Sequence, residues 1–262
     1  MHDLARVLLL GCLGTFAVSL GFMAAARPAL PERIAHYGVA IRLLGRWVYW
    51  WSAPLVRFLD ARSLSADHVT LLGCALTGVA ALLAAQGWWG LSGLALMFGA
   101  LCDLLDGELA RRQGAEHPAG AFLDSSLDRL SEIVLFGGMA WGFPDRLGGA
   151  AAFAALGASF MVSYTRARGE GLGVACPGGG LERPHRVLIL MFTLLFCALF
   201  PERWAAPAAA VACTVVAVGA AFTAGARLWA VYWLLQAGER PVPLPEVQVP
   251  ASPAPPGASG VR

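Results

Sequence analysis

Long apolar stretches are the feature that most constrains this chain. Seven of them approach the roughly 20 residues that a helix needs to cross a bilayer. They are residues 4–26, 69–87, 91–112, 120–143, 147–168, 185–200 and 204–226, and the last could run on to 237. Of the 262 residues, 58% are hydrophobic and only 14% are charged, well below the share in soluble domains. We therefore predict an all-α polytopic membrane protein.

The chain divides into four segments by composition. Residues 1–30 are expected to form an extra transmembrane span, or a signal-like anchor; the alternative is a cleaved signal peptide, because Arg6 precedes the apolar run and small residues follow it. Residues 31–64 combine five Arg with an aromatic stretch, which predicts an amphipathic helix at the membrane interface, kinked near Pro54. Residues 65–238 hold six spans, and the Pro-rich residues 239–262 are expected to be disordered.

The basic residues indicate how the chain is oriented. All of them are Arg, and the loops on one side of the predicted spans carry ten, whereas the other side carries only Arg146 and Arg203. Positive residues concentrate in cytoplasmic loops, so we expect the Arg-rich side to face the cytoplasm of a bacterial-type inner membrane. The net charge of +2 gives no sign of nucleic-acid binding. The six Cys are scattered, without the spacing of a zinc site or a disulfide framework.

Carboxylates inside the predicted spans indicate a functional site, since a charge in a span is costly. Asp103 and Asp106 are three residues apart, and Asp124 and Asp128 are four apart, so each pair shares one face of its helix. Four such carboxylates need a cation to neutralise them, and oxygen ligands favour Mg²⁺ or Mn²⁺. A transporter that uses the acids as a cation relay is the rival interpretation, although no inverted repeat is visible.

The acids belong to a longer pattern of eight fixed positions. It consists of Asp103, Asp106, Gly107, Ala110 and Arg111, then, after eight residues, Gly120, Asp124 and Asp128. This string resembles the DxxDGxxAR-x8-GxxxDxxxD signature of the CDP-alcohol phosphotransferase family. The resemblance implies six transmembrane helices around a polar cavity open to the cytoplasm, usually in a homodimer. It also implies transfer of a phosphatidyl group from CDP-diacylglycerol to an alcohol, with release of CMP.

The resemblance also implies roles for individual residues. The four Asp of the pattern would hold two divalent ions, and Asp128 would in addition be the general base. The residues expected at the CDP-lipid are Asp67, Thr70, Gly107, Arg111 and Gly120. At Asp67 a helix cap is an equally good explanation.

A second patch concerns the acceptor alcohol. Residues 163–170 and 178–186 resemble the SYxKARAE…ERPxR stretch of prokaryotic phosphatidylinositol-phosphate synthases, with Arg166 in place of Lys and Gly169 in place of Ala. Four arginines suit a phosphorylated polyol better than a neutral alcohol. They are Arg166, Arg168, Arg183 and Arg186. Inositol 1-phosphate is therefore the expected acceptor, and glycerol 3-phosphate or another polyol is the alternative.

Overall fold

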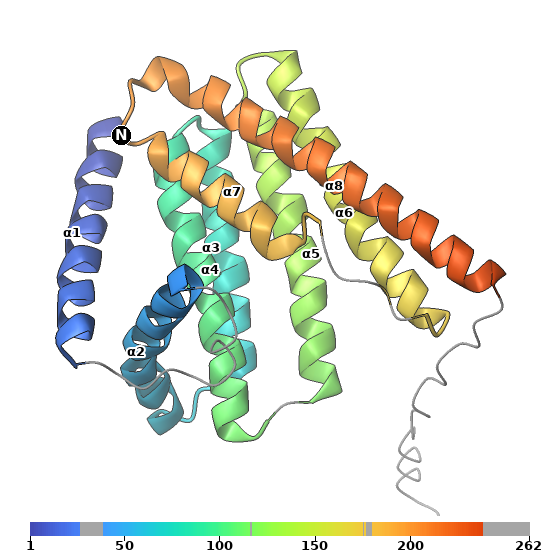
Figure 1. The fold of residues 1–262 in the computed structure, drawn as a ribbon. Helices are drawn as coiled ribbons and strands as arrows, with labels where there is room; N and C mark the ends of the chain where they lie inside the picture. The colour runs from blue at the N-terminus through green and yellow to red at the C-terminus, as the bar shows by residue number, and fades with distance from the viewer. Residues whose placement is uncertain (27–38, 116, 175, 177–179, 238–262) are drawn as a thin grey trace, which may run out of the picture.

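The computed structural model describes residues 1–26, 39–115, 117–174, 176 and 180–237. Within them the chain forms eight α-helices and one short 3₁₀-helix (Figure 1). The helices are α1 (His2–Ala26), α2 (Val39–Ala61), α3 (Ala66–Ala85), α4 (Trp89–Gln113), α5 (Pro118–Gly142), α6 (Arg146–Gly171), α7 (Arg183–Phe196), η2 (Glu202–Trp204) and α8 (Ala205–Gln236). The all-helical fold class is confirmed.

Helices α3, α4 and α5 run side by side, and α3 packs against both of the others (Figure 1). Small residues allow the close approach. A Cβ on Gly73 of α3 would lie 3.0 Å from Cβ of Cys102 on α4. Membrane helices favour such contacts because dispersion between closely packed backbones holds them together. Helix α7 crosses this group and packs on α4, while α6 and α8 lie along each other.

The glycines of α5 make a testable packing contact with α3. A Cβ on Gly138 would overlap the backbone of Ala81, whereas a Cβ on its neighbour Gly137 would meet nothing within 4 Å. We expect Gly138→Ala to lower the free energy of unfolding by about 1–3 kcal/mol, as overpacking does. Thermal unfolding in detergent measures this, with Gly137→Ala as the matched control. Equal stability of the two variants would contradict the close contact.

Within the described residues, five segments are long and apolar enough to cross a membrane, namely α1, α3, α4, α6 and residues 202–236, which include α8. Two predicted spans are not among them. Helix α5 has the length but carries Asp124, Asp128, Arg129 and Glu132. Helix α7 has only 14 residues, because it ends at Phe196 and a turn follows. At 1.5 Å per residue, α7 is about 21 Å long, which is less than the apolar thickness of a bilayer.

Helix α1 is attached to the far end of α7. The Arg6 guanidinium donates to the carbonyl oxygens of Ala198 and Leu199 at 3.4 and 3.2 Å, and the His2 ring lies 2.6 Å from the carbonyl oxygen of Phe200. These carbonyls follow the end of α7, where backbone acceptors lack partners within the helix. The predicted N-terminal helix is therefore present and joined to the helices that follow.

Helix α2 covers residues 39–61 of the predicted interfacial segment 31–64 and contains Pro54. Residues 27–38, which include Arg33, and the tail 238–262 lie outside the described part of the chain. Near the end of α2, Asp60 accepts a hydrogen bond from Arg112 at 2.8 Å and another from Gln113 at 3.4 Å. The hydrogen bond from Arg112 is the main reason that the pKa of Asp60 lies below its ordinary value.

Candidate active site

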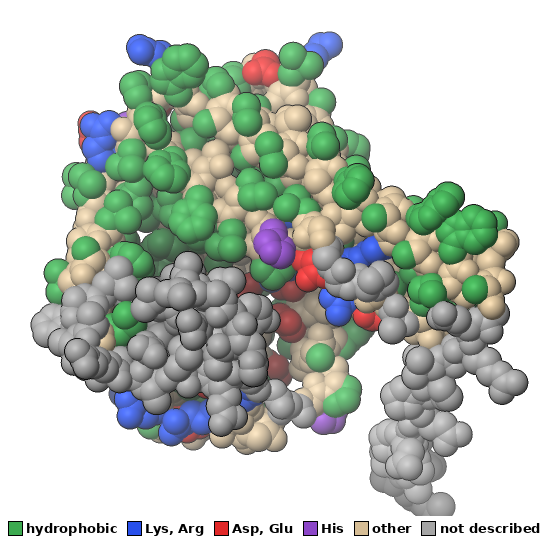
Figure 2. Space-filling view, viewed as in Figure 1, with side chains coloured by type: hydrophobic (Ala, Val, Ile, Leu, Met, Phe, Trp, Pro, Cys, Tyr) green, Lys and Arg blue, Asp and Glu red, His purple; other side chains and the backbone are tan. Residues whose placement is uncertain are grey.

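The four motif carboxylates lie on two helices that both pack against α3. Asp103 and Asp106 are in the second half of α4, and Asp124 and Asp128 are in the first half of α5. They are close enough to influence one another electrostatically. Figure 2 shows acidic side chains set back in a hollow, with basic side chains beside them. The exposed fraction is 28% for the side chain of Asp103 and 15% for that of Asp128, so both are recessed but reachable.

One arginine bridges the two acid pairs. Arg183, the first residue of α7, donates from Nη1 to Asp103 Oδ2 and from Nη2 to Asp128 Oδ1, both at 2.8 Å. Its third nitrogen, Nε, is buried without a hydrogen-bond partner. The guanidinium therefore occupies the space between the two helices with only part of its donor capacity used.

The chemistry of the donor set suits a hard divalent cation. All the candidate ligands are carboxylate oxygens, and Thr70 Oγ1 donates to Asp106 Oδ2 at 2.7 Å, which fixes one of them. In the described part of the chain, no three His, Cys, Asp or Glu side chains already form a ligand sphere. Arg183 supplies a positive charge between Asp103 and Asp128, and Arg129 lies 3.7 Å from Asp128.

The residues expected at the CDP-lipid lie in pairs around the carboxylates. Gly107 leaves room for Arg111, whose Nη1 would be 3.3 Å from a Cβ at position 107. Similarly, a Cβ on Gly120 would lie 3.7 Å from Oδ1 of Asp67. Thr70 and Asp106 form the hydrogen bond described above. These five residues and Asp106 come from α3, α4 and α5. The start of α3 therefore lies close to the motif on α4 and α5.

The helix cap proposed for Asp67 is not formed. The N-cap of α3 is Ser65, and Asp67 lies inside the first turn. A carboxylate there still interacts favourably with the positive end of the helix. His117 is the N-cap of α5, and its Nδ1 accepts a hydrogen bond from the backbone N–H of Ala119 at 3.1 Å.

The four arginines of the second patch have different surroundings. Arg166 pairs with Glu170 on the exposed side of α6 at 2.9 Å, and Arg168 is exposed near the end of the same helix. Arg183 reaches the carboxylates, as described. Arg186 is only 1% exposed and donates from Nε and Nη2 to Glu132 Oε1 at 3.0 and 2.6 Å, and from Nη1 to the carbonyl of Leu181 at 2.9 Å. The structure thus gives Arg186 a buried partner, and of the four only Arg183 contacts the motif carboxylates.

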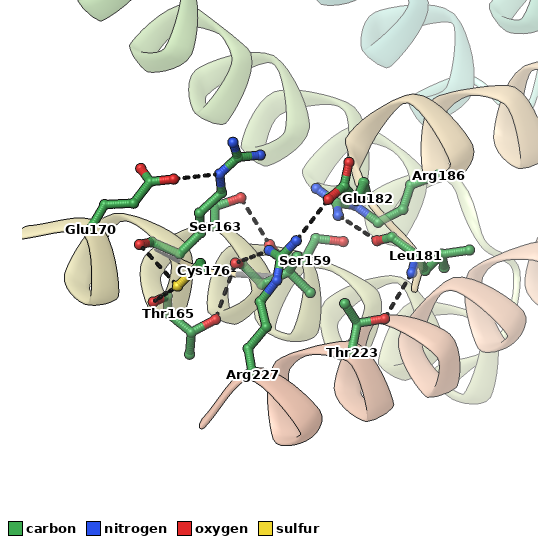
Figure 3. Close-up of polar contacts among 12 residues, drawn as sticks. Ser159, Ser163, Thr165, Glu170, Cys176, Leu181, Glu182, Arg186, Thr223 and Arg227 are labelled. Atoms are coloured by element: carbon green, nitrogen blue, oxygen red, sulfur yellow. Dashed lines mark hydrogen bonds and ion pairs between the residues drawn. The ribbon is translucent and has the colours of Figure 1, made fainter. Parts of the chain in front are cut away.

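Several charged residues near the site did not stand out in the sequence. Glu132 binds Arg186, and Arg129 lies 3.4 Å from Glu132 and 3.7 Å from Asp128. Arg227 of α8 is 5% exposed and donates to the carbonyl of Val162 and to Glu182 at 3.0 and 2.8 Å (Figure 3). The one available signal was the i, i+4 spacing of Asp128 and Glu132, which continues the acidic face of α5 by one turn.

Residues 63–234 match the model of one protein family, CDP-alcohol phosphatidyltransferase. The chain is 36% identical over 184 residues to a phosphatidylinositol phosphate synthase of Mycobacterium marinum, covering 68% of this chain and 78% of that protein. It is 41% identical over 134 residues to an archaetidylinositol phosphate synthase of Methanothermobacter thermautotrophicus, covering 50% of this chain and 67% of that protein.

Solved structures agree with these sequence matches. The phosphatidylinositol phosphate synthase of Mycobacterium tuberculosis with CDP-DAG bound has 33% sequence identity and a TM-score of 0.63, over 69% of this chain and 93% of that one. The same enzyme in complex with manganese and citrate has 32% identity and a TM-score of 0.64, over 69% and 88% of the two chains. Both coverages leave about a third of the present chain outside the match.

Proposed function

Because this chain belongs to the CDP-alcohol phosphatidyltransferase family, we propose that it transfers the phosphatidyl group of CDP-diacylglycerol to a phosphorylated polyol, inositol 1-phosphate first among them. Membership makes it a transferase, and the named acceptor is our inference from its relatives. The observation that carries the proposal is the set of four motif carboxylates on α4 and α5, two of which, Asp103 and Asp128, are bridged by Arg183.

In the proposed reaction the acceptor hydroxyl attacks the β-phosphorus of the CDP-lipid. A new P–O bond forms to the phosphatidyl group, the pyrophosphate P–O bond breaks, and CMP leaves. Asp128 accepts the proton of the hydroxyl as the bond forms, which is general-base catalysis. Arg111 binds a phosphate of the nucleotide through its guanidinium fork, Gly107 leaves room for that side chain, and Gly120 leaves room beside Asp67.

We infer that Asp103, Asp106, Asp124 and Asp128 hold two divalent ions, Mg²⁺ or Mn²⁺. When bound, such ions neutralise the charge on the pyrophosphate and on the leaving oxygen. The manganese-bound enzyme of M. tuberculosis supports this choice of ion. A homodimer and a site that faces the cytoplasm belong to the same proposal, supported by the family resemblance and by the Arg-rich loops.

The proposal is tested by CMP release from CDP-diacylglycerol, using the purified full chain in detergent with Mg²⁺. The acceptors are offered singly: inositol 1-phosphate, glycerol 3-phosphate, inositol and serine. We expect release with inositol 1-phosphate and at most a background rate with inositol and serine, because only a phosphate can use the arginines. Release with glycerol 3-phosphate alone would correct the acceptor, and release with serine or inositol alone would contradict the phosphorylated class.

A further inference from the structure

We propose that Arg183 is an exchangeable internal cation: it neutralises Asp103 and Asp128 until a divalent ion replaces it, and it is then free to bind the phosphate of the acceptor. This inference rests on the proposed function, and it adds an order to the binding events. Its basis is the pair of 2.8 Å contacts that Arg183 makes with carboxylates of two different helices.

The charge balance favours such an exchange. Asp103 and Asp128 carry two negative charges, and Arg183 offsets one of them at 2.8 Å; Arg129 lies farther from Asp128, at 3.7 Å, and is shared with Glu132. A divalent ion offsets both and leaves the guanidinium without a carboxylate to balance it. A recessed cation without a counter-charge is costly, so Arg183 then favours an anion. A phosphate matches the fork of the guanidinium, because it accepts two parallel hydrogen bonds.

The surroundings of Arg183 differ from those of a permanently buried arginine. Arg186, three residues later on α7, is 1% exposed, and all three of its nitrogens donate within the protein. The side chain of Arg183 is 21% exposed, and its Nε is buried without a partner. A guanidinium that is partly satisfied and reachable from solvent can leave its carboxylates at lower cost than one that is fully satisfied and buried.

The exchange predicts that the divalent ion and the acceptor phosphate help each other to bind. With no ion, both terminal nitrogens of Arg183 are engaged by Asp103 and Asp128, so the acceptor phosphate must compete with these carboxylates. By linkage, the factor by which the ion tightens acceptor binding equals the factor by which the acceptor tightens ion binding. Both factors should disappear when the guanidinium is removed.

The first experiment follows the unmodified protein. Phenylglyoxal labels accessible guanidinium groups, and peptide mass spectrometry reports the extent at each Arg. We expect Mn²⁺ to increase labelling of Arg183 severalfold and to leave Arg112, which pairs with Asp60 at the protein surface, unchanged. Unchanged or reduced labelling of Arg183 on Mn²⁺ addition would overturn the exchange.

The second experiment compares Arg183→Gln with Arg112→Gln, a matched control that removes one positive charge outside the carboxylate cluster. Mn²⁺ binding is measured by electron paramagnetic resonance without substrates. Inositol 1-phosphate binding is measured by calorimetry with and without Mn²⁺. We expect Arg183→Gln to bind Mn²⁺ about tenfold more tightly than the unmodified protein, which corresponds to ~1.4 kcal/mol, and to lose the coupling, while Arg112→Gln keeps both values.

Weaker Mn²⁺ binding by Arg183→Gln would mean that Arg183 organises the ligands instead of competing with the ion. Coupling that persists in this variant would also overturn the proposal. If Arg183→Gln does not fold, Arg183→Lys replaces it, because Lys keeps the charge but lacks the two-pronged donor, and the coupling should still fall. None of these measurements depends on turnover. They can therefore be interpreted even if the protein releases no CMP in the assay of the proposed function.

Discussion

Replacing Asp128 with Asn is expected to lower CMP release by about a thousandfold, in line with the loss of a general base. Asn has nearly the same shape, so the helix and its packing on α3 should remain. In the proposed reaction, however, the proton of the acceptor hydroxyl would lose the carboxylate that receives it, and one proposed ligand oxygen of the divalent ion would become a weaker amide. The rate of CMP release from CDP-diacylglycerol with saturating inositol 1-phosphate measures the effect.

The matched control for this variant is Asp60→Asn. It makes the same chemical change at an exposed carboxylate that pairs with Arg112. Helicity and the unfolding temperature in detergent should be similar for the two variants, while only Asp128→Asn loses activity. Full activity in a folded Asp128→Asn protein would remove this residue from the role of base.

The second large effect is expected from the buried ion pair of Arg186 and Glu132. Replacing Arg186 with Met leaves Glu132 buried, with only Arg129 at 3.4 Å to balance its charge, and leaves the carbonyl of Leu181 without its donor. Removing one partner of a buried pair typically costs about 3–5 kcal/mol. We expect the free energy of unfolding to fall by about 3 kcal/mol, at the lower end of that range because Arg129 remains. Thermal or denaturant unfolding in detergent measures it.

This prediction separates two roles that Arg186 could have. If its main role is to bind the acceptor, Arg186→Met keeps its stability and loses only affinity for inositol 1-phosphate. If the role is structural, the double variant Arg186→Met with Glu132→Leu regains much of the lost stability, because no buried charge is left unpaired. A stable single variant would contradict the structural role.

Much of the fold could be predicted from single segments of the sequence. The apolar runs predicted α1, α3, α4 and α6 to within a few residues, and α8 with the extension to 237, since length and hydropathy are properties of the run itself. The length of α7 did not follow from the apolar run: the chain turns after Phe196, and the carbonyls beyond the turn bind Arg6 and His2, which are almost two hundred residues away in the chain.

The site shows the same division between local and distant information. The spacing of the four Asp placed each pair on one helix face, and the structure brings the two pairs close enough to interact electrostatically. The partners of the arginines could not be read from spacing. Arg183 and Arg186 are one helical turn apart, yet one reaches the motif carboxylates and the other is buried against Glu132. Only the packing of α7 against its neighbours decides between these surroundings.

The contact between α1 and the end of α7 has a consequence for biosynthesis. The chain emerges N-terminus first, so α1 enters the membrane while the carbonyls of Ala198 and Leu199 have yet to be made. Until then Arg6 lacks these acceptors, and α1 cannot form its contact with the segment that follows α7. A contact that spans 192 residues can therefore close only after residue 198 has been made. Helix α1 thus gains this contact later than its packing against α4.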